Sequence, residues 1–130
     1  MTTTQSSREI GTAAYVLTAV LAAFLLFLGL YGFLSPVAAA RGFGIPLADP
    51  ADAVYIAIKA GRDLGIGAMV IALLISGRRG PLFGLIAASV IIPLNDCAQV
   101  MATGRVGYGL AVHASAAAYG LVILWLLRRR

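Results

Sequence analysis

The amino-acid sequence predicts an all-α integral membrane protein in which a single four-helix bundle takes up residues 1–130. Hydrophobic residues make up 61% of the chain, whereas soluble domains contain about 45–50%. These residues gather in four stretches, and a helix needs about 20 apolar residues to cross a bilayer. The spans are expected at about 12–34, 51–76, 81–102 and 108–127. We therefore expect a multi-pass protein of the cell membrane.

The first span, residues 12–34, contains no charged residue. Ser35-Pro36 ends it, because the residue before a proline is disfavoured in the helical conformation. The segment 41–46 is rich in glycine and proline, which predicts a tight turn rather than a domain.

The second span, residues 51–76, follows Asp49, Pro50 and Asp52. These residues suit a helix N-terminus through capping, through proline in the first turn and through the helix dipole. Small residues recur every four positions along the span and allow another helix backbone to come close. They form a face through which a homo-oligomer can pack: Ala53, Ala57, Gly61 and Gly65.

The third span, residues 81–102, contains Pro93, which removes a backbone hydrogen bond and is expected to kink the helix. The fourth span, residues 108–127, ends at Trp125 and a basic tail. An aromatic residue beside basic residues is typical of the membrane interface.

Basic residues also predict the orientation. With four spans, both termini lie on the same side as the turn at 77–80. That side holds six basic residues (Arg8, Arg78, Arg79, Arg128, Arg129 and Arg130), and the other side holds two (Arg41 and Arg105). Since basic residues favour the cytoplasmic side, the N and C termini are expected in the cytoplasm.

Three ionisable residues, Lys59, Arg62 and Asp63, interrupt the second span. Such residues at the centre of a membrane helix cost roughly 2.5–3.5 kcal/mol each. Their spacing of three and four places them toward one side of the helix. They form either a self-neutralising ion pair that stabilises helix packing or part of a binding or proton-handling site.

The third and fourth spans bring Asp96 and His113 to a similar depth, each roughly 10 Å from the outer end of its helix. The inner halves of these helices contain almost no polar residues. Lys59 and Arg62 can be balanced by Asp63 and Asp96, which leaves His113 free to exchange a proton. The sequence therefore predicts a buried polar site in the outer half of the bilayer.

We expect the site to bind or convert a small lipophilic molecule by acid/base chemistry. A protonated arginine suits an oxygen of the ligand, and an Asp/His pair suits proton transfer. The candidate catalytic residues are Asp96, His113, Arg62 and Asp63, and the candidate ligand-binding residues are Lys59, Tyr55, Asn95 and Gln99. In an alternative interpretation, His113 is a packing residue, and Asn95 satisfies backbone groups freed by Pro93.

Other functions are disfavoured. Phosphate-binding, nucleophile-elbow and zinc-protease motifs are absent from the sequence. A single histidine and the single cysteine, Cys97, make a metal site improbable, and no cofactor is evident. Basic residues are not interleaved with aromatic residues, so nucleic acid is not an expected partner. Two alternative functions remain open: a structural or accessory membrane subunit, and a proton-coupled transporter.

Several short motifs resemble an uncharacterised family of small four-helix membrane proteins, which is a domain of unknown function. They are Gly44-Ile45-Pro46, Lys59 to Gly67 (KAGRDLGIG), Ile92 to Asp96 (IPLND) and His113. The family is in turn broadly similar to the DoxX-like four-helix membrane proteins, which are linked to quinone and redox processes. This second resemblance implies a quinone-like lipophilic ligand.

Overall fold

The computed structural model describes residues 10–129, and within this range every regular element is helical. Its elements are α1 (Thr12–Leu34), α2 (Pro36–Phe43), the short 3-10 helix η1 (Pro50–Asp52), α3 (Ala53–Ile75), α4 (Arg79–Ser89), α5 (Ile91–Ala102) and α6 (Tyr108–Arg128). Two of the basic residues used to predict the orientation, Arg8 and Arg130, lie outside the described residues.

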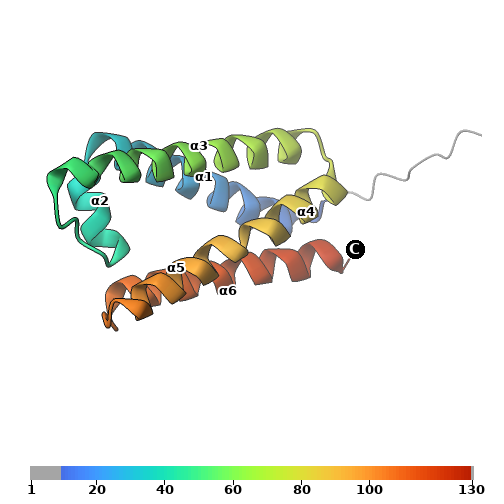
Figure 1. Cartoon of the computed structure of the whole chain (residues 1–130). Coiled ribbons are helices and arrows are strands. Elements are labelled where there is room, and N and C mark those ends of the chain that lie inside the picture. The colour runs from blue at the N-terminus through green and yellow to red at the C-terminus, as the bar shows by residue number, and fades with distance from the viewer. Residues whose placement is uncertain (1–9, 130) are drawn as a thin grey trace, which may run out of the picture.

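The helices form two antiparallel pairs, α1 with α3 and the α4–α5 segment with α6 (Figure 1). The two pairs contact each other at the end that holds the turn between α3 and α4, and they diverge toward the other end. There the short helix α2 contacts α1, α3 and α6. We call the first region the closed half and the second the open half.

Small residues bring α1 and α3 close together. A Cβ atom on Gly32 would lie 2.8 Å from the Cβ atom of Ala60, and one on Gly67 would lie 3.1 Å from Leu26. In a membrane, such close backbone approach provides the van der Waals packing that holds helices together. The face of small residues predicted for a homo-oligomer contact is a different one, because its members Gly61 and Gly65 are exposed on α3.

The closed half contains the apolar core. Its buried members come from α1, α3, α4 and α6: Ala14, Ala22, Val70, Leu74, Leu82, Ile86, Ile123 and Leu127. Two polar contacts join the helices around this core. The hydroxyl of Tyr119 donates a hydrogen bond of 2.9 Å to the carbonyl of Leu17, and the guanidinium of Arg79 donates to the carbonyl of Leu127.

The third predicted span is interrupted, as expected from Pro93. Helix α4 ends at Ser89, and α5 begins at Ile91. Pro93 has no N–H group to donate to the carbonyl of Ser89, and the next bond, from Leu94 N–H to the Val90 carbonyl, is long at 3.4 Å. The α4–α5 segment still runs on as one rod (Figure 1).

The connection between the first two spans differs from the prediction. The sequence predicted only a turn here, whereas residues Pro36–Phe43 form α2 and the turn follows at Gly44. Pro36 occupies the first turn, where a missing N–H is harmless, and Gly44 ends the helix with a φ of 102°. Ser35-Pro36 therefore ends one helix and begins another. The predicted helix start at Asp49 is confirmed, since its carboxylate accepts a hydrogen bond of 2.8 Å from the N–H of Ala51.

Three helical segments are long and apolar enough to cross a membrane: Thr12–Leu34, Arg79–Ala102 and Tyr108–Arg128. They indicate a membrane protein. Helix α3 has the same length as α1, 23 residues, but three ionisable residues, Lys59, Arg62 and Asp63, set it apart from these three segments.

Candidate functional site

On α3, both cations of the ionisable cluster contact one carboxylate. The Nζ of Lys59 lies 2.6 Å from Oδ2 of Asp63, and the Nη2 of Arg62 lies 3.2 Å from Oδ1. Asp63 is only 3% exposed, whereas the side chains of Lys59 and Arg62 are 28% and 39% exposed. The helical spacing of four aligns Lys59 with Asp63. Two charges therefore satisfy Asp63, and neither hydrogen-bonds to Asp96.

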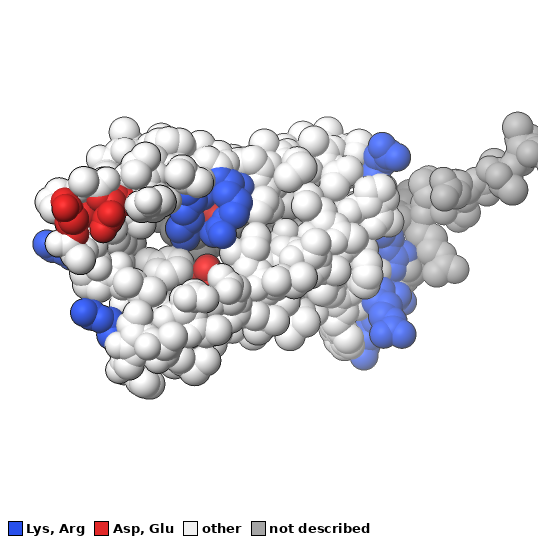
Figure 2. Space-filling view, viewed as in Figure 1, with Lys and Arg blue, Asp and Glu red and all other residues white. Residues whose placement is uncertain are grey.

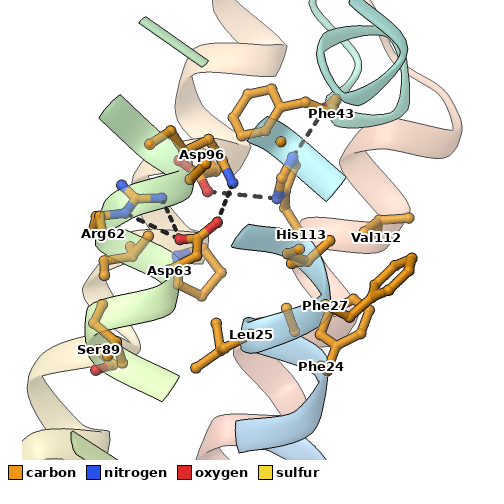
Figure 3. A pocket seen from close by; sticks show the side chains of 18 of the residues that line it. Phe24, Leu25, Phe27, Phe43, Arg62, Asp63, Ser89, Asp96, Val112 and His113 are labelled. Atoms are coloured by element: carbon orange, nitrogen blue, oxygen red, sulfur yellow. Dashed lines mark hydrogen bonds and ion pairs between the residues drawn. The ribbon is translucent and has the colours of Figure 1, made fainter. Parts of the chain in front are cut away.

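Asp96 on α5 instead faces His113 on α6. The Oδ2 atom of Asp96 lies 3.7 Å from Nδ1 of His113, slightly beyond hydrogen-bond distance. The other ring nitrogen, Nε2, lies 3.0 Å from the backbone carbonyl of Phe43. The Phe43 ring also packs on the imidazole, with ring centroids 4.3 Å apart. Figure 3 shows His113 held between the Phe43 carbonyl and the Asp96 carboxylate.

The contact with Phe43 determines where the histidine proton lies. A backbone carbonyl can only accept a hydrogen bond, so Nε2 must carry the hydrogen. In the neutral ring, Nδ1 then presents a lone pair toward Asp96, which repels an ionised carboxylate. One added proton removes this repulsion, whether it is on Nδ1 or on the carboxyl group. The Asp96–His113 pair is therefore a place where a single proton can be held or released.

Asp96 has no hydrogen-bond donor within residues 10–129, although it is buried at 8% exposure. Buried polar groups normally have a hydrogen-bond partner, and an unpaired carboxylate is especially unfavourable. Its oxygens line a cavity. A donor group in that cavity would complete its hydrogen bonding.

The cavity has a volume of about 340 Å³ and lies between the two helix pairs in the open half. Figure 2 shows a hollow in one face of the molecule, with basic side chains on its rim and an acidic atom inside. Most of its wall is apolar, including Leu21, Leu25, Leu28, Ile66, Ile92 and Val112. Its charged residues and its histidine gather at one place: Lys59, Arg62, Asp63, Asp96 and His113. A mostly apolar cavity with a few convergent polar groups is typical of a small-molecule site.

The structure does not bring every predicted residue to this cavity. Tyr55 is 67% exposed on α3. Asn95 and Gln99 lie on the outer face of α5, where the Gln99 amide lies 3.5 Å from Asn95 Oδ1. Asn95 directly precedes Asp96, and consecutive residues on a helix lie about 100° apart around its axis. The two side chains therefore face different surroundings. The ligand-binding role of Tyr55, Asn95 and Gln99 remains a prediction without geometric support.

Other residues at the cavity were not singled out by the sequence. Phe43 lies in the segment predicted to turn, and its carbonyl positions His113. Its signal was the Ser35-Pro36 pair before it and Gly44 after it, which together delimit a short helix. Phe24, Phe27 and Tyr31 line the cavity from α1. Their spacing of three and four was visible in the sequence, but the residues had no distinguishing feature within an apolar span.

The described residues contain no group of three or more His, Cys, Asp or Glu side chains that could hold a metal ion. Cys97 is half-buried and does not line the cavity. At the cavity, Arg62, Asp96 and His113 can supply hydrogen bonding, charge stabilisation and proton transfer.

No curated protein and no solved structure matches the chain. The DoxX likeness therefore remains a prediction. A family model, described as "Domain of unknown function (DUF4267)", matches residues 22–127. This match covers most of the two helix pairs and every residue that lines the cavity except Leu21. The chain belongs to the DUF4267 family, which confirms the expected membership of an uncharacterised family.

Proposed function

We propose that the cavity binds a small lipophilic molecule within the membrane and that the Asp96–His113 pair exchanges a proton with its polar head. The observation that carries this proposal is the position of Asp96. A buried acid without a donor within residues 10–129 stands at the polar end of an apolar cavity, beside an oriented imidazole.

We propose helix α3 as a fourth membrane span. Its 23 residues extend over about 35 Å, enough to cross a hydrocarbon core. Its three ionisable residues neutralise one another in part and face the cavity, which is how charged groups are accommodated in membrane proteins. It also runs beside α1 along the bundle (Figure 1).

We further propose that the closed half lies on the cytoplasmic side of the membrane. The described basic residues at that end are Arg78, Arg79, Arg128 and Arg129, and no acidic residue accompanies them within 10–129. At the other end Arg41 and Arg105 are accompanied by Asp49 and Asp52. Because lysine and arginine favour the cytoplasmic side, the cavity falls in the outer half of the bilayer.

The arrangement suits reversible removal of a proton from an O–H or activated C–H group. His113 Nδ1 would accept the proton, and the resulting imidazolium would be stabilised by the adjacent Asp96 carboxylate. The electron pair left on the ligand, placed on an oxygen, would face Arg62 and Lys59. Return of the proton to a different ligand atom completes an isomerisation and restores the pair.

Asp63 has a supporting role in this scheme. It holds Lys59 and Arg62 at the rim of the cavity through contacts of 2.6 and 3.2 Å. One carboxylate shared by two cations leaves excess positive charge toward the cavity, which favours an electron-rich oxygen on the ligand.

A proton-coupled transporter is a weaker alternative. Beyond the cavity, the closed half is filled by side chains such as Leu82 and Ile123, each 0% exposed. Within residues 10–129, the buried members of this core are all apolar. A path to the second side would require a different conformation.

The test is mass spectrometry of small molecules that co-purify with the full chain in a mild detergent. We expect wild type to retain a lipophilic compound, and Asp96→Asn and Arg62→Gln to lose it while keeping the helical circular-dichroism spectrum. Leu94→Ala, at an exposed position on the same helix as Asp96 that does not line the cavity, is the matched control and should retain the compound. Equal retention by all variants would reject the proposal and favour an accessory or structural role.

A further inference from the structure

The cavity has a second opening whose walls differ from the charged rim. Phe24 and Phe27 on α1 and Tyr108 on α6 line the cavity and are also 44%, 59% and 79% exposed. A residue that contributes to the cavity wall and to the outer surface marks an opening. In Figure 3, Phe24, Phe27 and Val112 lie on the opposite side of the site from Arg62 and Ser89. The aromatic opening thus lies between α1 and α6.

The aromatic residues of α1 form a continuous row at this opening. The rings of Phe24 and Phe27 are stacked with centroids 6.5 Å apart, and those of Phe27 and Tyr31 with centroids 5.8 Å apart and nearly parallel planes. From Phe24 to Tyr31 the row extends about 10 Å along the helix. It offers a flat apolar surface that leads from outside the bundle toward His113.

At the polar end of the cavity, the hydrogen-bond acceptors and the hydrogen-bond donors of the chain lie at separate places. Asp96 and His113 Nδ1 both require a hydrogen-bond donor. The carboxylate has only acceptor oxygens, and the ring hydrogen of neutral His113 is on Nε2, where it is donated to the Phe43 carbonyl. On the opposite side Arg62 uses Nε and Nη2 for Asp63, and its Nη1 has no hydrogen bond within residues 10–129. A hydroxyl can donate to Asp96 while an oxygen of the same head accepts from Arg62.

The charged residues at the site further restrict the head group that a ligand can carry. Two cations, Lys59 and Arg62, and two carboxylates, Asp63 and Asp96, balance each other when His113 is neutral. A cationic head would be repelled by Lys59 and Arg62, and an anionic head by the unpaired Asp96. A neutral head that carries a hydroxyl fits both requirements.

We infer that the ligand is a neutral, hydroxyl-bearing amphiphile that reaches the site sideways from the lipid, between α1 and α6. Its apolar part lies along Phe24, Phe27 and Tyr31, and its hydroxyl donates to Asp96. This inference rests on the proposed function, since it names the ligand class of the same cavity.

The experiment uses the full chain in phosphatidylcholine nanodiscs and a dodecanol analogue with a diazirine near the end of its chain. After illumination, labelled peptides are mapped by mass spectrometry. We expect saturable labelling of the α1 segment around Phe24 to Tyr31 that Asp96→Asn reduces strongly. Unlabelled dodecanol should compete at about tenfold lower mole fraction than dodecyl methyl ether, because the ether has lost the donor to a charged acceptor. Dodecylammonium should compete no better than the ether.

The route is tested with Ala116→Trp, which fills the cavity wall on α6, and with Ala114→Trp, an exposed position on the same helix that does not line the cavity. We expect Ala116→Trp to slow labelling and Ala114→Trp to leave it unchanged. If Ala116→Trp fails to fold, the map of labelled peptides in wild type decides the route. Labelling confined to α5 and the Arg62 side of α3 would overturn it.

Two failures are distinguishable. Equal competition by dodecanol and its methyl ether, with labelling that still depends on Asp96, would overturn the hydroxyl assignment and leave the proposed function standing. Labelling that is unsaturable for every head group and identical in wild type and Asp96→Asn would overturn both.

Discussion

The two halves of the bundle are built from the same helices but solve different problems. In the closed half, Leu82, Ile86 and Ile123 interlock with almost no exposed surface. In the open half, the same helix pairs diverge around a cavity of about 340 Å³ that is lined by Lys59, Arg62, Asp63 and Asp96. The closed half holds the pairs together, so the open half can keep a space and an unpaired acid.

Two local backbone features mark the open half. The helical hydrogen bonding of the α4–α5 segment is interrupted at Val90, between the two halves. At the far end, Gly109 of α6 lies so close to Gly44 that a Cβ atom on Gly109 would be 2.7 Å from the Gly44 Cα atom. This contact seats α2 against α6 as the cover of the cavity. The tightly packed core and the polar cavity thus lie at opposite ends of one short bundle.

The largest effect on stability is expected from Asp63→Asn in the open half. The substitution leaves Lys59 and Arg62 without the carboxylate that both contact. Removing one partner of a buried ion pair costs about 3 kcal/mol, the lower end of the measured range because both cations are part-exposed. Unfolding in mixed micelles measures this loss. Asp52→Asn, outside the cavity, is the control and should change stability by about 0.5 kcal/mol or less. A negligible loss for Asp63→Asn would mean that the cluster does not anchor the open half.

A pair of identical truncations compares the two halves directly. Ile123→Ala removes a side chain that is 0% exposed and should cost about 2 kcal/mol, mainly through the cavity that it creates. Ile92→Ala removes the same atoms from the wall of an existing cavity and should cost about 1 kcal/mol or less, since fewer contacts are lost. Unfolding of both variants under the same conditions provides the measurement. Equal losses would contradict the distinction between a packed and an open half.

The smallest side-chain change, with a large effect on the site, is Gly109→Ala. The added methyl group pushes against Gly44 and the Phe43 carbonyl, and such overpacking costs about 1 kcal/mol. Because Phe43 then shifts from His113, the ¹⁵N resonance of His113 Nε2 should change in NMR spectra. Gly84→Ala, which has open space around it, should leave that resonance in place. An unchanged resonance in Gly109→Ala would show that α2 does not orient the imidazole.

Much of the architecture was predictable from the sequence. Apolar length identified the segments of α1, α4–α5 and α6, and the absence of an N–H group in Pro93 predicted the interruption near Val90. The meeting of Arg62, Asp63, Asp96 and His113 was also predictable, because similar depth along antiparallel helices brings residues together. Which acid pairs with which cation was not, since rotation of each helix about its axis decides it. That rotation places Asp96 inward and Asn95 outward.

The role of Phe43 was beyond sequence reasoning for a different reason. Its contribution to His113 is a backbone carbonyl, and every residue carries one. Only the path of the chain through α2 selects this particular carbonyl, and that path depends on the close approach of Gly44 and Gly109.

This feature has a practical consequence for genetics. Replacing Phe43 by alanine deletes an aromatic ring but leaves the oxygen that holds the imidazole, so a conventional alanine scan would rank position 43 by its ring alone. The hydrogen bond responds instead to substitutions at the two glycines, neither of which has a side chain to contribute. Loss-of-function alleles at Gly44 and Gly109 would therefore act through His113, although neither substitution changes the histidine itself.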